Sequence, residues 1–370
     1  MKYILPILLL FPLLAFAQTH IVLSNGQAIQ KGGNLVVKDA NFTVKGSFLA
    51  TAGTVEMTGT ASTANSKLGG TGTSQFHELV IDKNSNDVQL NGTISIVNTL
   101  RFAQGKLALG NHHCTLNNGA SITNTAADKY VQTNGTGTLL QQVANSNTTF
   151  PVGNANYNPL ILKNEGTSDT YGVRMIDEVL TSGTTGAAET SKVVDRTWLV
   201  NEETTGGSNL TVTTQWNTSE ELSFDRRLAT ISRYGSAWET PIPIGASGSN
   251  PYTVTRSGLT AVGAFSVRQG LNSISVATAP SSVVENAGNN LVFTFTRMGV
   301  NVGALTIHFT VGGTATFGVD YTQSGATTFT TTSGTVVIPD GMPSAIMTIS
   351  PTSDTAVEAN ETVILTIANP

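Results

Sequence analysis

The sequence predicts an all-β chain, and three observations lead to that fold class. Glycine (37 residues), threonine, serine and asparagine are abundant, which is typical of short strands joined by tight turns. Apolar residues recur as brief i, i+2 pairs in the first part of the chain and as longer alternating runs afterwards. The repeat region shows no stripe with the 3.6-residue period of a helix. We therefore expect a β-solenoid-like repeat region followed by two β-sandwiches.

Length and composition limit the number of domains and the classes of partner that we expect. A chain of 370 residues exceeds one ordinary domain, so we expect two or three units. Its 19 Lys and Arg against 24 Asp and Glu form no basic stripe, which argues against a nucleic-acid partner. The single cysteine, Cys114, excludes an internal disulfide framework and a multi-cysteine zinc site.

Residues 1–17 have the pattern of a cleaved signal peptide. Lys2 supplies the positive charge, an apolar stretch follows from Ile4 to Leu14, and Ala15-Phe16-Ala17 supplies a cleavage site. The apolar stretch is short for a membrane span, which needs about 20 residues. We expect a mature chain beginning at Gln18, without a transmembrane helix, that is secreted or displayed on the cell surface.

Residues 18–159 carry the repeat. Pairs such as Val55/Met57 and Ile94/Ile96 recur every six or seven residues, with Asn or Gly between them. That spacing leaves room for one very short strand and a turn, and three such units of about 20 residues make a plausible coil of a β-solenoid. A meander or a sandwich of short strands is the alternative.

Residues 160–270 predict a β-sandwich, because the strands lengthen and alternate in polarity. The expected strands are 160–162, 193–200, 210–216, 229–234, 252–254 and 264–267. Phe150–Gly153 and Asp195–Trp198 resemble segments of β-solenoid and β-sandwich modules in secreted surface proteins of Bacteroidota. Trp198, Trp216 and Trp238 suggest either sugar stacking or core packing, and their places on strands favour packing.

Residues 271–370 contain the most specific motifs. They run in the order ENAG (Glu285–Gly288), TFTR (Thr294–Arg297), GTATFGVDY (Gly313–Tyr321) and DTAVEANET (Asp354–Thr362). This order and spacing resemble the Calx-β family of immunoglobulin-like sandwiches. Ser353 stands where many members have an acid, and the family's last strand would follow Pro370, so we expect this sandwich to be incomplete.

The resemblance implies a Ca²⁺ site at one end of the sandwich. By position, Glu285, Asp320, Asp354 and Glu358 would be ligands, and Glu361 a ligand or an outer partner. Ca²⁺ takes six to eight oxygen ligands, often from several carboxylates, which agrees with this choice of residues. The alternative is a metal-free spacer whose acids lie in solvated loops.

Other candidate sites are weaker. His112-His113-Cys114 lacks the ligand number for zinc, and we expect Cys114 to pack in the repeat. The acidic pairs Asp177-Glu178, Glu202-Glu203 and Glu220-Glu221 are typical of solvated turns. No phosphate loop or hydrolase motif is found.

The sequence therefore predicts an exported structural or adhesive protein without enzymatic activity, with calcium, cell-surface glycans or other surface proteins as partners. The Calx-β resemblance adds cell communication and membrane association. The alternative is a secreted protein that binds or degrades polysaccharide on its β-solenoid.

Overall fold

The computed structural model describes residues 20–60, 66–84, 87–355 and 359–368. Strands account for 59% of the chain and helices for 3%, which confirms the all-β prediction. The chain forms two compact units: unit 1 extends to residue 225 and includes 230–239 and 246–269, and unit 2 holds 226–229, 240–245 and the chain from 270 onward. The predicted signal peptide lies outside the described residues. Within the described ranges, no helix is long and apolar enough to cross a membrane.

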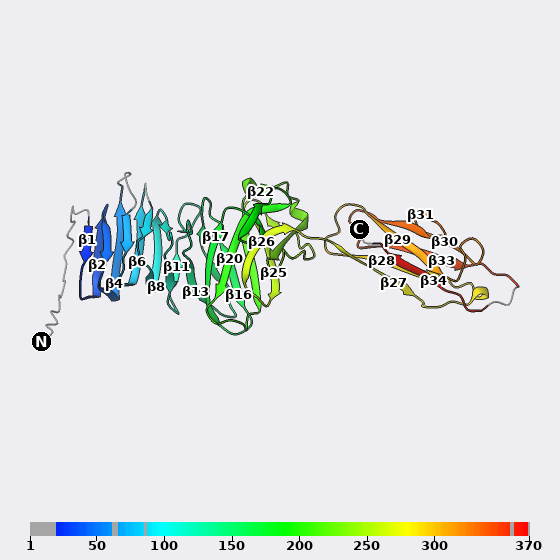
Figure 1. Ribbon diagram of the computed structural model, residues 1–370, viewed down its shortest axis with the longest axis horizontal. Helices are drawn as coiled ribbons and strands as arrows, with labels where there is room; N and C mark the ends of the chain where they lie inside the picture. The colour runs from blue at the N-terminus through cyan, green and yellow to red at the C-terminus, as the bar shows by residue number, and fades with distance from the viewer. Residues whose placement is uncertain (1–19, 61–65, 85–86, 356–358, 369–370) are drawn as a thin grey trace. The chain divides into compact units, whose positions relative to one another are not determined.

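Unit 1 begins with a parallel β-solenoid of about six turns, as predicted (Figure 1). One sheet has the order β1-β3-β5-β7-β9-β12-β15, and the other begins β2-β4-β6-β8-β10-β13. The strands are β1 (His20–Leu23), β2 (Gln27–Lys38), β3 (Asn41–Val44), β4 (Ser47–Gly59), β5 (Ser66–Gly69), β6 (Thr73–Lys83), β7 (Val88–Leu90), β8 (Ile94–Gln104), β9 (Leu107–Ala108), β10 (Cys114–Leu116), β11 (Ser121–Thr123), β12 (Val131–Gln132), β13 (Leu139–Val143) and β15 (Val152–Gly153).

Most coils have three strand segments, and in the long strands β2, β4, β6 and β8 two of these segments belong to one strand. In β4 the register against β6 shifts between Leu49 and Thr54, so one strand supplies two faces of the coil. β8 likewise pairs with β10 through its first residues and with β11 through its later ones. Equivalent apolar residues then stack from coil to coil, as in the series Val55, Leu79, Leu100 and Ile122.

The solenoid continues into a β-sandwich within the same sheet. β13 pairs in parallel with β10 and antiparallel with β17, and the sheet then runs β17-β20-β26-β23, with β22 beside β20. The facing sheet has the order β14-β16-β21-β25-β24, and β18-β19 forms a separate hairpin. The added strands are β14 (Thr148–Phe150), β16 (Leu160–Asn164), β17 (Asp169–Ile176), β18 (Leu180–Ser182), β19 (Thr185–Ala188), β20 (Val193–Glu202), β21 (Leu210–Trp216), β22 (Glu221–Leu222), β23 (Ala229–Arg233), β24 (Ser247–Gly248), β25 (Tyr252–Leu259) and β26 (Gly263–Gln269), with the short 3-10 turn η1 (Thr218–Glu220). The 3-10 turn η2 (Arg226–Leu228) belongs to unit 2.

Unit 2 is a second sandwich, made of two four-stranded antiparallel sheets. Their orders are β27-β28-β33-β30 and β31-β32-β29-β34. The elements are β27 (Ser273–Ala279), η3 (Glu285–Ala287), β28 (Leu291–Met298), β29 (Leu305–Gly313), β30 (Tyr321–Ser324), β31 (Thr328–Phe329), β32 (Ser333–Ile338), β33 (Ser344–Pro351) and β34 (Val363–Ile367).

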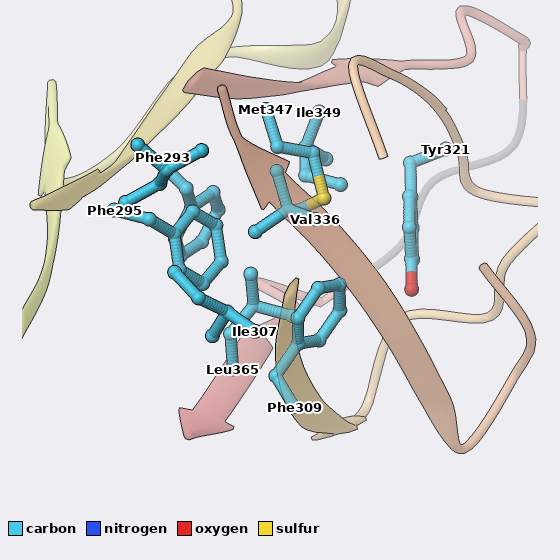
Figure 2. Packing of buried hydrophobic residues seen from close by; sticks show 10 residues of the cluster. Phe293, Phe295, Ile307, Phe309, Tyr321, Val336, Met347, Ile349 and Leu365 are labelled. Carbon is cyan, nitrogen blue, oxygen red and sulfur yellow. The ribbon is translucent and has the colours of Figure 1, made fainter. Parts of the chain in front are cut away.

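Alternate residues of these strands point inward and fill the core of unit 2 (Figure 2). Phe295 of β28 and Phe309 of β29 are almost fully buried, with ring centroids 5.5 Å apart. Met347 of β33 and Val336 of β32 complete the contact between the sheets. The two-sheet architecture expected for this part of the chain is therefore present.

Candidate functional site

Two of the predicted calcium ligands lie together at one end of unit 2. Glu285 begins the 3-10 turn η3, and Asp354 lies in the loop after β33. The backbone N–H of Asp354 donates to Glu285 Oε1 at 2.9 Å. The neighbouring residues Ser353 and Asn286 are also in contact through their side chains. These contacts join two of the loops in which the sequence analysis placed calcium ligands.

Asp320 reaches the same end of the sandwich through its backbone. Its carbonyl oxygen accepts a hydrogen bond from the N–H of Thr352, at 2.9 Å. Its carboxylate, however, accepts the N–H of Thr316 at 2.5 Å and so closes the turn that precedes β30. Asp320 therefore stabilises its own loop and brings that loop to the segment before Asp354.

The remaining two predicted ligands come before β34 in the sequence. Glu358 lies outside the described residues, and Glu361 is an exposed residue just before β34. Over the ranges that the structure describes, no three His, Cys, Asp or Glu side chains form a group that could hold a metal ion. The described part of this end contains Glu285 and Asp354, and carboxylates are among the oxygen ligands that Ca²⁺ takes.

Unit 1 contains a buried ionic network that the sequence reasoning missed. We expected Glu220 to lie in a solvated turn, but that expectation was wrong: it is only 2% exposed. Arg196 Nη2 donates to Glu220 Oε1 at 3.1 Å, and Asn158 Nδ2 donates to Glu220 Oε2 at 2.7 Å. Glu220 also accepts the backbone N–H of Asn217, at 2.8 Å. The buried carboxylate is thus paired with a cation and hydrogen-bonded to separate segments of the sandwich, as a buried charge in a folded core requires.

The tryptophans belong to the structure of the sandwich. Trp198 and Trp216 are fully buried, and their indole N–H groups donate to the Asn158 carbonyl and to Glu221 Oε1, both at 2.8 Å. Half-buried Trp238 donates to the Leu180 carbonyl at 2.8 Å and stacks with Arg268. Core packing, rather than sugar stacking, is thus the role of Trp198 and Trp216.

The His112-His113-Cys114 segment is also explained by structure. Cys114 is fully buried in the solenoid, where it stacks on Ile94. Burial raises the pKa of its thiol to about 12. The His113 ring contacts Thr138 Oγ1 at 2.7 Å across the next coil. These residues tie neighbouring coils together, as the packing interpretation of Cys114 predicted.

A hollow of about 440 Å³ lies on the outer face of the sandwich sheet of unit 1. Its floor comes from β17, β20 and β26, and the tip of the β18-β19 hairpin forms one wall. We call it the Arg174 hollow; its principal polar and aromatic lining residues are Arg174, Ser182, Thr184, Asn201 and Tyr234. The sequence did not point to these residues, because they come from four places in the chain and carry no motif.

The hairpin is held over the sheet by its own contacts. Gly183 lies against the Tyr234 ring so closely that a Cβ there would be 2.8 Å from Tyr234 Cδ1. Glu189, just after the hairpin, accepts from Arg268 Nη2 at 3.1 Å. The wall of the Arg174 hollow is therefore fixed by packing and by an ion pair.

Comparison of the chain with models of protein families, with curated proteins and with solved structures gives no match.

Proposed function

We propose that this chain is an exported structural or adhesive protein of the cell surface, and that its C-terminal Calx-β-like sandwich binds calcium. The observation that carries the structural role is the 12-stranded sheet, which runs from the solenoid into the sandwich of unit 1 without an interruption. Under this proposal, unit 1 is a stiff support and the sandwiches carry the contacts with partners.

The sheet supports this role for a physical reason. A parallel solenoid ends in an edge strand whose backbone groups pair readily with other chains. Here β13 is that last strand, and β17 covers its free edge over five residue pairs, from Leu139↔Val173 to Val143↔Asp169. A load applied across this junction is therefore shared by ladder hydrogen bonds and by the buried core on both sides.

The calcium role rests on the tie between Glu285 and Asp354 and on the family resemblance. Ca²⁺ would draw its oxygens from Glu285, Asp320 and Asp354, with Glu358 and Glu361 from the following segment. Bridging these loops would stiffen one end of unit 2, because the loops belong to different strands.

Thermal unfolding of the full chain, with Ca²⁺ and with chelator, tests the calcium role. All three tryptophans lie in unit 1, so Trp fluorescence follows unit 1 and calorimetry follows both units. A ligand that binds only the folded state raises the melting temperature. We expect Ca²⁺ to raise the melting temperature of one calorimetric transition, and we expect Trp fluorescence not to detect that transition.

Glu285→Gln should abolish that rise, because the amide still accepts from Asp354 but has lost the charge. Glu165→Gln, at an exposed surface ion pair of unit 1, is the matched control and should leave the rise unchanged. An equal shift in Glu285→Gln and in the unaltered chain would reject the site.

Surface labelling of intact producing cells tests the location. We expect an antibody against the chain to stain intact cells, and cells lacking the gene to attach less well to a solid surface. Staining only after permeabilisation would contradict the exported, adhesive role.

A further inference from the structure

Arg174 projects from the outer face of β17 into the Arg174 hollow and is half-buried there. Its Nη1 donates to the backbone carbonyl of Gly135 at 3.2 Å. In the described ranges, no carboxylate lies within ion-pair distance of this guanidinium. Burial lowers the pKa of Arg174, and no neighbouring acid opposes that effect.

Other partly buried arginines of unit 1, in contrast, are paired with carboxylates. Arg196 pairs with Glu220 at 3.1 Å, Arg256 with Glu239 at 2.6 Å, and Arg268 with Glu189 at 3.1 Å. A guanidinium that is partly removed from water is stabilised by an anion, and its planar donors match a carboxylate with two parallel hydrogen bonds. The Arg174 hollow therefore contains a cation that a negatively charged ligand would neutralise.

The other residues that line the hollow indicate which kind of molecule would carry the carboxylate that binds Arg174. Ser182, Thr184 and Asn201 are exposed residues that offer hydroxyl and amide groups, and these both donate and accept hydrogen bonds. Tyr234 adds an aromatic surface. A sugar ring presents hydroxyl groups and apolar C–H faces together, so it suits this lining better than a peptide backbone does. The volume of about 440 Å³ lies within the range of small-molecule sites.

We propose that the Arg174 hollow binds a uronate residue of an acidic polysaccharide, with Arg174 on the carboxylate, Tyr234 beside the ring and the hairpin tip on the hydroxyl groups. This inference goes beyond the proposed function, since it concerns unit 1 and needs neither calcium nor a surface location.

Calorimetric titration of the full chain with short oligosaccharides tests the proposal. The probes are oligomers of galacturonate, glucuronate and mannuronate, together with methyl-esterified oligogalacturonate, which keeps the sugar ring and loses the charge. We expect at least one acidic oligomer to bind, the ester to bind much more weakly, and added salt to reduce the affinity. Absence of binding by all three acidic oligomers would overturn the proposal.

Two variants locate the site. Arg174→Gln should lower the affinity about tenfold to a hundredfold, since a charged hydrogen-bonding partner is lost. Asn201→Asp should do the same by placing a competing carboxylate in the hollow, and its exposed position makes misfolding no explanation. Arg101→Gln, at an exposed arginine of β8, is the control and should bind like the unaltered chain.

Two results would contradict the site or the ligand class. Full affinity in both Arg174→Gln and Asn201→Asp would place binding elsewhere. Equal or tighter binding of an acetylated alanine tripeptide with a free C-terminal carboxylate would show that the hollow takes peptide carboxylates and not sugars. Trp fluorescence melting of each variant reports whether the sandwich has kept its fold.

Discussion

Arg196 Nη2 and Glu220 Oε1 lie 3.1 Å apart in the sandwich of unit 1, with side chains only 8% and 1% exposed. Arg196 Nε also donates to Asn158 Oδ1 at 3.2 Å, and Asp177 Oδ1 lies 3.3 Å from the same nitrogen. Asn158 follows the last solenoid strands, whereas Glu220 precedes β22. The ion pair thus joins segments that are distant in the sequence.

Removal of the arginine alone should be severely destabilising. Arg196→Met leaves the Glu220 carboxylate buried without its counter-ion, which costs about 3–5 kcal/mol in comparable cases. We expect a corresponding fall in the free energy of unfolding, measured by urea denaturation with Trp fluorescence. The fluorescence of Trp198 should follow the unfolding of this network, because its indole N–H donates to the Asn158 carbonyl.

The matched control is Lys163→Met, which breaks an ion pair at the surface. Lys163 Nζ and Glu165 Oε1 are 2.7 Å apart, but their side chains are 32% and 49% exposed. Such pairs contribute less than about 1 kcal/mol. Similar losses in the two variants would show that the Arg196 network is not the stabilising feature inferred here.

The thiol of Cys114 should be inert in the folded chain. It is fully buried, and burial raises its pKa to about 12, so almost no reactive thiolate is present near neutral pH. We expect no labelling by an aromatic disulfide reagent in native buffer and complete labelling in guanidinium chloride. Rapid labelling without denaturant would mean that the coil around Cys114 opens readily.

The same shift predicts a loss of stability in alkali. The pKa is 9.0 in the unfolded chain and about 12 in the folded one, so above the lower value the unfolded state has released a proton that the folded state keeps. The free energy of unfolding should fall by about 1.4 kcal/mol per pH unit between these values. Cys114→Ala should lack this part of the pH dependence. Identical slopes for the variant and the unaltered chain would exclude the thiol as the cause.

Glycines at the solenoid corners should resist substitution because neighbouring coils touch there. A Cβ at Gly92 would lie 1.9 Å from the carbonyl oxygen of Gly70 in the preceding coil. Gly92→Ala should therefore cost about 1–3 kcal/mol, as overpacking does. The measurement is urea denaturation followed by far-UV circular dichroism.

Gly235→Ala is the control for this prediction. A Cβ at Gly235 would meet only the guanidinium of Arg233, whose Nη2 would be 3.5 Å away, and this is an ordinary contact. Its effect should stay within about 1 kcal/mol. If both alanine variants are equally stable, the close approach of the coils is not rigid.

Much of this fold could be predicted from the sequence, because strand alternation and repeat spacing are local properties. All six strands expected in the first sandwich are present, and the three-segment coil follows from the six-to-seven-residue spacing. The sequence did not single out β17, although alternate residues of it are buried: Tyr171, Val173 and Met175. The alternation of Tyr171, Val173 and Met175 with Gly172 and Arg174 is the signal that could have found this strand.

The sites were less predictable, because they depend on residues that only the fold brings together. Glu285 and Asp354 were chosen by resemblance, and their loops do meet. Arg174 lies on β17 and Tyr234 directly follows β23, and no local sequence pattern marks an arginine without a carboxylate partner among the described residues. Glu220 was misjudged for the same reason, since its burial is due to Arg196 and Asn158, far away in the sequence.

The unfolding of unit 2 should be visible by calorimetry but not by Trp fluorescence. Phe295 and Phe309 face each other in the core of unit 2, and unit 2 contains no tryptophan. Phe295→Ala should destabilise unit 2 by about 3–5 kcal/mol, because a buried aromatic ring is replaced by a cavity.

Calorimetry should then show one transition moved to lower temperature, while the transition followed by Trp fluorescence stays in place. Phe295→Leu, which keeps more of the core volume, should have a smaller effect in the same direction. A parallel fall of the Trp-detected transition would show that the two units unfold together, and unit 1 would then depend on the core of unit 2.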